Sequence, residues 1–211
     1  MCLRGRGFQL AVKHVCDRIV SAIMLCLLAP LLLGIALVVI LQSGWPAIFV
    51  QPRVGRDGRL FKIYKFRTMI HGASGKGLRT TIADNDDRIT RVGVLLRKWS
   101  LDELPQLVNV LKGDMSLVGP RPTLEYQVSQ YTLHQRRRLE VKPGITGWAQ
   151  VNGRNALPWV RRIELDIWYV DNFTLWLDAK ILFRTVGVFL RREGLYGQGG
   201  VNDDFGTKRN L

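Results

Sequence analysis

The sequence is poor in cysteine and in acidic residues. Its three cysteines, Cys2, Cys16 and Cys26, lie near the N-terminus, and two of them fall in or beside an apolar stretch. Their spacing matches neither a disulfide framework nor a metal site, so we expect a reducing, cytoplasmic environment for most of the chain. With 17 acidic against 31 basic residues and a net charge of +14, the chain needs an acidic partner, which nucleic acid, anionic lipid or a phosphorylated substrate could provide.

Several binding signatures are also absent from the sequence. The glycines of residues 71–78 lack the strand, lysine and hydroxyl context of a nucleotide P-loop. No zinc-finger, RNA-recognition or recognition-helix pattern accompanies the basic charge, so no nucleic-acid partner is predicted. The chain has no internal repeats, and its 211 residues suit one domain with an appendage or two small domains.

Residues 19–41 form a long apolar run without a charge. As a straight helix this run would span roughly 34 Å, enough to cross a bilayer core of about 30 Å. It is longer than the apolar region of an ordinary signal peptide, and no clean small-residue cleavage site goes with it. Basic residues flank the run on both sides, and such residues prefer the cytoplasmic face of a membrane.

Pro30 lies almost at the midpoint of the run. Proline removes one backbone hydrogen bond and bends a helix. The two arms, 19–29 and 31–41, would each span about 16 Å, roughly half of the hydrocarbon thickness. We therefore expect residues 1–44 to form a re-entrant membrane hairpin, because this arrangement puts both basic flanks on one side. A spanning helix is the alternative, since proline kinks occur there too.

The remaining chain is predicted to form a mostly helical cytoplasmic domain over residues 45–193, with short strands, and the predicted fold class is therefore α+β. Alternating apolar residues and a glycine-containing turn predict two strands, and helical patterns predict a short basic helix and a longer polar one. These predicted elements cover residues 47–51, 60–69, 90–99 and 123–140.

Residues 157–192 interleave aromatic residues with cations, a composition typical of amphipathic helices that lie in a membrane interface. Packing in the protein core and contact with a second copy of the chain, as a homodimer, are the alternatives for these aromatics. The glycine-rich residues 194–211 are expected to form a flexible tail.

The most informative stretch is residues 100–107, which places two carboxylates, Asp102 and Glu103, side by side. Ser100 followed three residues later by Glu103, ahead of an apolar run, is a capping-box pattern and predicts a helix start. The first turn of a helix favours negative charge, so a carboxylate there stays ionised and could act as a nucleophile or a metal ligand. The alternative is that the two acids only cap the helix. Pro105 falls early in this helix, so either the first turn is irregular or Asp102 is the cap.

Basic residues from several segments of the sequence are candidates for binding phosphate beside these two acids. Lys65 and Arg67 belong to the second predicted strand, where they form either a solvated face or a basic wall for phosphate. Arg97 ends the predicted basic helix. Arg121 has a proline on each side, and a stiffened arginine suits bidentate recognition of phosphate or carboxylate. Arg154 lies in a loop rich in turn formers and donors, and such loops often bind ligands.

The chain resembles the small monotopic phosphoglycosyl transferases, the bacterial sugar transferases that begin the assembly of lipid-linked glycans. The resemblance extends over nearly the whole chain, from Lys13 to Lys180. The matching motifs cover residues 65–69, 100–107, 113–116 with 118–122, and 143–150. The hairpin of that family often has Ser-Pro at its break. This chain has Ala29 before Pro30, so the membrane break rests on the proline alone.

The resemblance implies transfer of a sugar-1-phosphate from a UDP-sugar to undecaprenyl phosphate, with release of UMP and with Mg²⁺ as cofactor. Asp102 would be the nucleophile that forms an aspartyl-phosphosugar and would also contact the metal. Glu103 would be its catalytic partner, acting as the base that assists attack by the lipid phosphate. Arg97 and Arg121 would bind phosphate, with Lys65, Arg67 and Arg154 as further candidates.

By the same resemblance, the protein would act at the bacterial inner membrane with its catalytic domain facing the cytoplasm. It would catalyse the first membrane step in making a capsule, O-antigen, exopolysaccharide or glycoprotein glycan. Hexose and N-acetylhexosamine donors both fit. The alternative is a bitopic membrane protein whose basic, non-enzymatic cytoplasmic domain binds lipid or a partner, with Asp102 and Glu103 acting only as caps.

Overall fold

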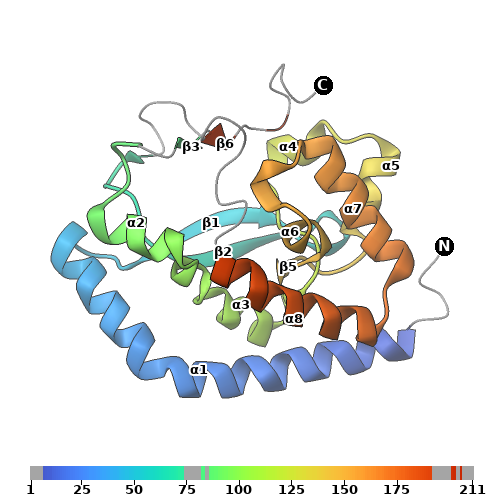
Figure 1. Ribbon diagram of the computed structural model, residues 1–211, viewed down its shortest axis with the longest axis horizontal. Coiled ribbons are helices and arrows are strands. Elements are labelled where there is room, and N and C mark those ends of the chain that lie inside the picture. Colours follow the sequence, from blue (N-terminus) through green and yellow to red (C-terminus); the bar gives the residue numbers. More distant parts are fainter. Residues whose placement is uncertain (1–6, 74–81, 84–85, 192–200, 203–204, 206–211) are drawn as a thin grey trace.

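The computed structural model describes residues 7–73, 82–83, 86–191, 201–202 and 205 (Figure 1). Within these residues the fold is α+β, as the sequence predicts. The helices are α1 (Gly7–Ser43), α2 (Arg91–Lys98), α3 (Gln106–Lys112), α4 (Glu125–Ser129), α5 (Leu133–Arg136), α6 (Trp148–Val151), α7 (Trp159–Asn172) and α8 (Leu175–Arg191). The strands are β1 (Ile48–Val54), β2 (Leu60–Phe66), β3 (Ile82–Ala83), β4 (Ser116–Val118), β5 (Gly144–Thr146) and β6 (Val201–Asn202).

Helix α1 is a single long helix that contains Pro30. It bends along its length, and its second part runs on at an angle to the first without doubling back (Figure 1). Among the described helices, α1 is the one long and apolar enough to cross a membrane, judged by length and composition. Because the helix continues through Pro30, the re-entrant hairpin over residues 1–44 is not confirmed and stays a prediction.

Buried charges fix the first half of α1 to the rest of the fold. Lys13 Nζ lies 2.5 Å from Asp178 Oδ2 on α8 and 3.6 Å from Asp17 Oδ2. Asp17 accepts a hydrogen bond of 2.5 Å from Ser116 on β4, and Asp178 accepts one of 2.7 Å from Tyr169 on α7. Buried charges are costly unless they are paired, so this network holds four elements in one arrangement.

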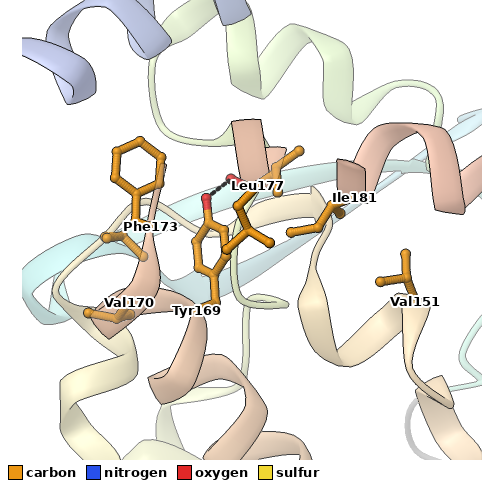
Figure 2. Packing of buried hydrophobic residues seen from close by; sticks show 8 residues of the cluster. Val151, Tyr169, Val170, Phe173, Leu177 and Ile181 are labelled. Carbon is orange, nitrogen blue, oxygen red and sulfur yellow. Dashed lines mark hydrogen bonds between the residues drawn. The ribbon is translucent and has the colours of Figure 1, made fainter. Parts of the chain in front are cut away.

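The main core lies where α7 and α8 pack on α6 and on the parallel pair formed by β4 and β5 (Figure 2). The edge of the Tyr169 ring meets the Phe173 ring at a centroid distance of 6.0 Å. The Tyr169 hydroxyl oxygen, whose proton points to Asp178, also lies 3.4 Å from the Val118 carbonyl oxygen, which places α7 against β4. The other buried members are Val141, Val151, Val170, Leu177 and Ile181.

This core changes the interpretation of residues 157–192. The buried face of α7 supplies Tyr169 to the core, and Phe173, directly after α7, is also fully buried, so these two aromatics do not belong to a membrane interface. On α8, by contrast, Trp176 and Phe183 are 80% and 83% exposed. The interfacial interpretation therefore suits the outer face of α8, where membrane contact stays a prediction.

Strands β1 and β2 form the predicted antiparallel hairpin, with Ile48 opposite Phe66 and Val54 opposite Leu60. Successive side chains of a strand point to opposite faces. Phe66 packs against α1 and α2, whereas Ile63 packs against α3. Lys65 shares the face of Ile63, so the hairpin directs this lysine toward the segment that carries the two acids.

The prediction of one polar helix over residues 123–140 is wrong. The chain forms α4, α5 and a 3-10 turn, η4 (Arg137–Leu139), because Thr132 starts a new helix by accepting a hydrogen bond from the Gln135 amide at 3.2 Å. The predicted tail lies mostly outside the described residues. Its β6 residues pair with β3, and Phe205 packs edge-on against Tyr131 at 5.2 Å between ring centroids.

Candidate active site

The two acids lie on an irregular connection between α2 and α3. Helix α2 is capped by Thr90 and ends at Lys98. Ser100 then takes a left-handed conformation with φ of 52°, and a 3-10 turn, η3 (Leu101–Glu103), precedes α3. The irregular first turn that Pro105 predicts is confirmed. The predicted capping box is wrong, because the Ser100 side chain caps no amide and instead accepts a hydrogen bond from Arg154 Nη2 at 3.1 Å.

Glu103 is buried and held by two cations. Its Oε1 lies 2.9 Å from Lys65 Nζ and 2.6 Å from Arg121 Nη2, and its Oε2 accepts from Arg121 Nη1 at 3.3 Å. Burial raises the pKa of Glu103, but the charges of Arg121 and Lys65 outweigh it and hold the pKa well below its usual value. Glu103 is therefore an anion at neutral pH. These contacts do not favour the base role that the family resemblance implies, because a base must take up a proton.

Asp102 has the opposite environment. Among the described residues, no hydrogen bond or ion pair engages its carboxylate. Burial, followed by the negative charge of Glu103, raises the pKa of Asp102, while Lys65, Arg97 and Arg121 act in the other direction. A carboxylate without bonded partners keeps its lone pairs available to attack an electrophile. The adjacent acids thus differ: Glu103 is engaged by cations and Asp102 is open to the pocket.

Asp102 lines a pocket of about 640 Å³ between the β1–β2 hairpin, the segment after β2 and the start of α7. The volume suits a small-molecule substrate. Four of the predicted cations line the same pocket: Lys65, Arg67, Arg97 and Arg121. The structure therefore brings together residues that are up to 56 positions apart in the sequence, between Lys65 and Arg121.

The predicted cations differ in how they are held. Arg97 donates from Nε to Thr68 Oγ1 at 2.9 Å. Arg67 is buried, donates to the Gly44 carbonyl and lies 2.5 Å from His71 Nδ1, so it ties the end of α1 to the pocket wall. Arg154 is not among the residues that line the pocket; it supports Ser100 from outside.

Part of the pocket wall is not identified by the sequence. Trp159 and Arg162, at the start of α7, both line the pocket, and the Arg162 guanidinium lies 4.5 Å from the centre of the Trp159 ring. Arg162 Nε donates to the Leu157 carbonyl at 2.9 Å, and Nη1 donates to Asn155 Oδ1 at 3.3 Å. The sequence placed both side chains in a group of interfacial residues, and no local signal separates them from that group.

The site can contribute little protein coordination to a metal. The described residues contain no group of three or more His, Cys, Asp or Glu side chains that could hold one. Mg²⁺, however, commonly binds one or two carboxylates together with substrate phosphates and water. Asp102, whose carboxylate has no bonded partner in the described part of the chain, fits such a shared site, whereas the oxygens of Glu103 are already occupied by Lys65 and Arg121.

Comparison with known proteins gives consistent matches. Residues 8–192 match the family model described as bacterial sugar transferase. The chain is 50% identical over 184 residues to the uncharacterized sugar transferase EpsL of Bacillus subtilis, which covers 87% of this chain and 90% of that protein.

Two longer relatives also match. The chain is 46% identical over 200 residues to the undecaprenyl-phosphate galactose phosphotransferase of Salmonella typhimurium, covering 88% of this chain and 42% of that protein. It is 43% identical over 188 residues to the UDP-glucose:undecaprenyl-phosphate glucose-1-phosphate transferase of Escherichia coli, covering 85% of this chain and 40% of that protein. The chain thus spans less than half of these two relatives.

Proposed function

Because the chain belongs to the bacterial sugar transferase family, we propose that it transfers a sugar-1-phosphate from a UDP-sugar to undecaprenyl phosphate and releases UMP. The names of the Salmonella and Escherichia relatives support this acceptor. The observation that carries the proposal is the carboxylate of Asp102, which has no hydrogen-bond or ion-pair partner among the described residues and lies in a pocket that also presents Lys65, Arg97 and Arg121. The two relatives are named for galactose and glucose, so the sugar is left to experiment.

In the first step, an Asp102 oxygen attacks the phosphorus that bears the sugar. The bond from this phosphorus to the bridging oxygen breaks, and UMP leaves with the electron pair of that bond. The product is an aspartyl-phosphosugar, and no other reactant is consumed. An ionised carboxylate attacks without losing a proton, so this step needs no general base.

The physical difficulty of this step is charge, because a carboxylate and a diphosphate repel each other. Lys65, Arg97 and Arg121 offset this repulsion, since phosphoryl transfer depends chiefly on positioning and charge stabilisation. Glu103 engages one edge of the Arg121 guanidinium through two hydrogen bonds. The remaining N–H groups of Arg121 can then face the diphosphate. Asp102 is the residue that would hold Mg²⁺, and the metal would supply further neutralisation of negative charge.

In the second step, an oxygen of undecaprenyl phosphate attacks the same phosphorus. The bond to Asp102 breaks, the carboxylate is regenerated, and the product is an undecaprenyl diphosphate sugar. A phosphate monoester has its second pKa at about 6, so the acceptor is largely dianionic at neutral pH and also needs no base. This agrees with Glu103 serving as the anion that orients Lys65 and Arg121.

The lipid acceptor stays in the bilayer while the UDP-sugar is dissolved in water. We propose that α1 holds the domain at the cytoplasmic face of the bacterial inner membrane, where the two substrates meet at Asp102. The apolar surface of residues 19–41 of α1, which carry no charge, supports this placement, since Leu27, Leu33 and Leu41 are each more than 70% exposed.

The test is UMP release by the full chain in detergent with undecaprenyl phosphate and a panel of UDP-sugars. We expect release with at least one of UDP-glucose, UDP-galactose or an N-acetylhexosamine donor, and its loss in Asp102→Asn. Asp57→Asn is the matched control, because Asp57 is an exposed acid in the β1–β2 turn. No UMP release with any donor, or unchanged turnover in Asp102→Asn, would overturn the proposal.

A further inference from the structure

Another buried ion pair lies next to the site and has no part in the mechanism above. Arg138, in η4, places Nη2 2.5 Å from Asp166 Oδ2 on α7, and both side chains are only 3% exposed. Arg138 Nη1 donates to the Tyr131 hydroxyl at 2.7 Å. Removing an arginine and an aspartate from water is costly, and such a pair often stabilises no better than apolar residues would. The contacts that the pair makes therefore need a reason beyond stability.

One of these contacts reaches the active site. Arg138 Nη2 also donates to the backbone carbonyl of Arg121 at 3.0 Å. Proline fixes its own φ and restricts the residue before it, so Pro120 and Pro122 already limit the backbone around Arg121. The hydrogen bond from Arg138 restrains the peptide group that follows Arg121. The side chain of Arg121 then extends from this restrained backbone to Glu103.

We propose that Arg138, held by Asp166 and Tyr131, is a positioning residue that aims the Arg121 guanidinium at Glu103 and the pocket. The effect on substrate rests on the proposed function, whereas the orientation of Arg121 does not. A pair that only stabilised the fold could be replaced by apolar residues without consequence for Arg121.

The neighbouring residue provides a matched control. Arg137 lies on the same 3-10 turn and also pairs with an aspartate of α7, with Nη2 2.5 Å from Asp171 Oδ1. Its side chain and that of Asp171 are 33% and 35% exposed. Arg137 also pairs with Glu140, and within the described part of the chain it does not contact Arg121. Loss of this pair therefore removes an arginine–aspartate contact without releasing the Arg121 carbonyl.

The experiment compares Arg138→Met/Asp166→Leu with Arg137→Met/Asp171→Leu in the full chain in detergent. The first double variant removes the donor to Arg121 while filling the buried space with apolar groups. Three quantities are measured: thermal unfolding, the NMR signal of the Arg121 Nε–H group, and kcat and KM for UMP release. Arg138→Lys is a second variant that keeps a charge beside Asp166, but its single ammonium cannot bridge all three partners.

We expect a folded Arg138→Met/Asp166→Leu protein whose Arg121 signal has moved. Its kcat should fall by about 10- to 100-fold, because small displacements of a positioning group are costly, with a much smaller change in KM. The Arg137 variant should change neither the signal nor kcat. In an Arg121→Met background, Arg138→Lys should have no further effect on kcat, because it acts through Arg121.

An unchanged Arg121 signal with unchanged kcat in either folded Arg138 variant would overturn the positioning role. So would equal effects from the Arg137 control. If the wild-type protein releases no UMP with any donor, the proposed function fails, and the Arg121 signal still decides whether Arg138 positions this side chain.

Discussion

Replacement of Arg121 tests how the site balances the charge of the diphosphate. Arg121 uses Nη1 and Nη2 to hold both oxygens of Glu103, at 3.3 and 2.6 Å. Lysine in its place could keep the positive charge but could not make this two-pronged contact. Methionine would remove both the charge and the contact. The two substitutions therefore separate the value of the charge from the value of the geometry.

The expected magnitudes follow from the contacts. A hydrogen bond to a charged group contributes about 1.5–3 kcal/mol, and we take the lower end because the Arg121 side chain is 40% exposed. Arg121→Lys should lose one such bond to the diphosphate, about 1.5 kcal/mol, because lysine is not oriented by Glu103 in the same way, and this corresponds to roughly tenfold in kcat/KM. Arg121→Met should lose two such bonds, about 3 kcal/mol, which corresponds to roughly 100-fold.

The assay is steady-state UMP release with the donor that the panel identifies. Arg136→Lys and Arg136→Met are the matched controls, because Arg136 is an exposed arginine at the end of α5. The expected order of kcat/KM is wild type, then Lys, then Met at position 121, with little change at position 136. Equal activity of both Arg121 variants and the wild type would refute the role of this guanidinium.

Three further predictions concern pH, stability and metal. Burial and the charge of Glu103 raise the pKa of Asp102, so kcat/KM should fall as the pH drops through that pKa. Glu103→Gln removes the neighbouring negative charge and should move this acidic limb of the pH profile to lower pH. A limb that does not move would contradict the assignment of the limb to Asp102. Lys13→Met leaves Asp17 and Asp178 buried without their cation. Loss of one partner of a buried pair lowers the free energy of unfolding by about 3–5 kcal/mol, and each kcal/mol lowers Tm by about 2–4 °C, so Tm should fall by roughly 10 °C. The exposed Lys62→Met should leave Tm nearly unchanged, and an equal Tm for both variants would contradict the buried network. Excess EDTA should abolish UMP release and added Mg²⁺ should restore it. Full turnover in EDTA would show that the reaction needs no Mg²⁺.

Local patterns in the sequence account for part of the fold. The β1–β2 hairpin follows from alternating apolar residues around a glycine-containing turn, and α2 follows from a helical pattern over residues 90–99, whereas the Thr90 cap is shown only by the structure. Pro105 correctly signals an irregular helix start. The left-handed Ser100 could not be predicted, because a serine takes positive φ only where the surrounding structure holds it there.

Other features depend on contacts between distant parts of the chain. A run of arginines at residues 136–138 predicts charge near a helix end, but only the placement of α7 shows that Arg138 is buried against Asp166. Composition alone also cannot show which face of a helix is buried, so it leaves Trp159 and Arg162 between a membrane interface, the protein core and a second copy of the chain, whereas the structure shows that they line the pocket. The predicted hairpin of residues 1–44 depends on the bilayer as well as on contacts within the chain.

The central claim is that Asp102 carries the sugar phosphate, and intact-protein mass spectrometry tests it most directly. The protein is mixed with its UDP-sugar in the absence of undecaprenyl phosphate and then quenched. We predict release of UMP together with a mass increase equal to one sugar phosphate, located on the peptide that contains Asp102. The added mass should disappear when undecaprenyl phosphate is supplied and should be absent in Asp102→Asn. UMP release that requires undecaprenyl phosphate and leaves the protein mass unchanged would contradict the claim.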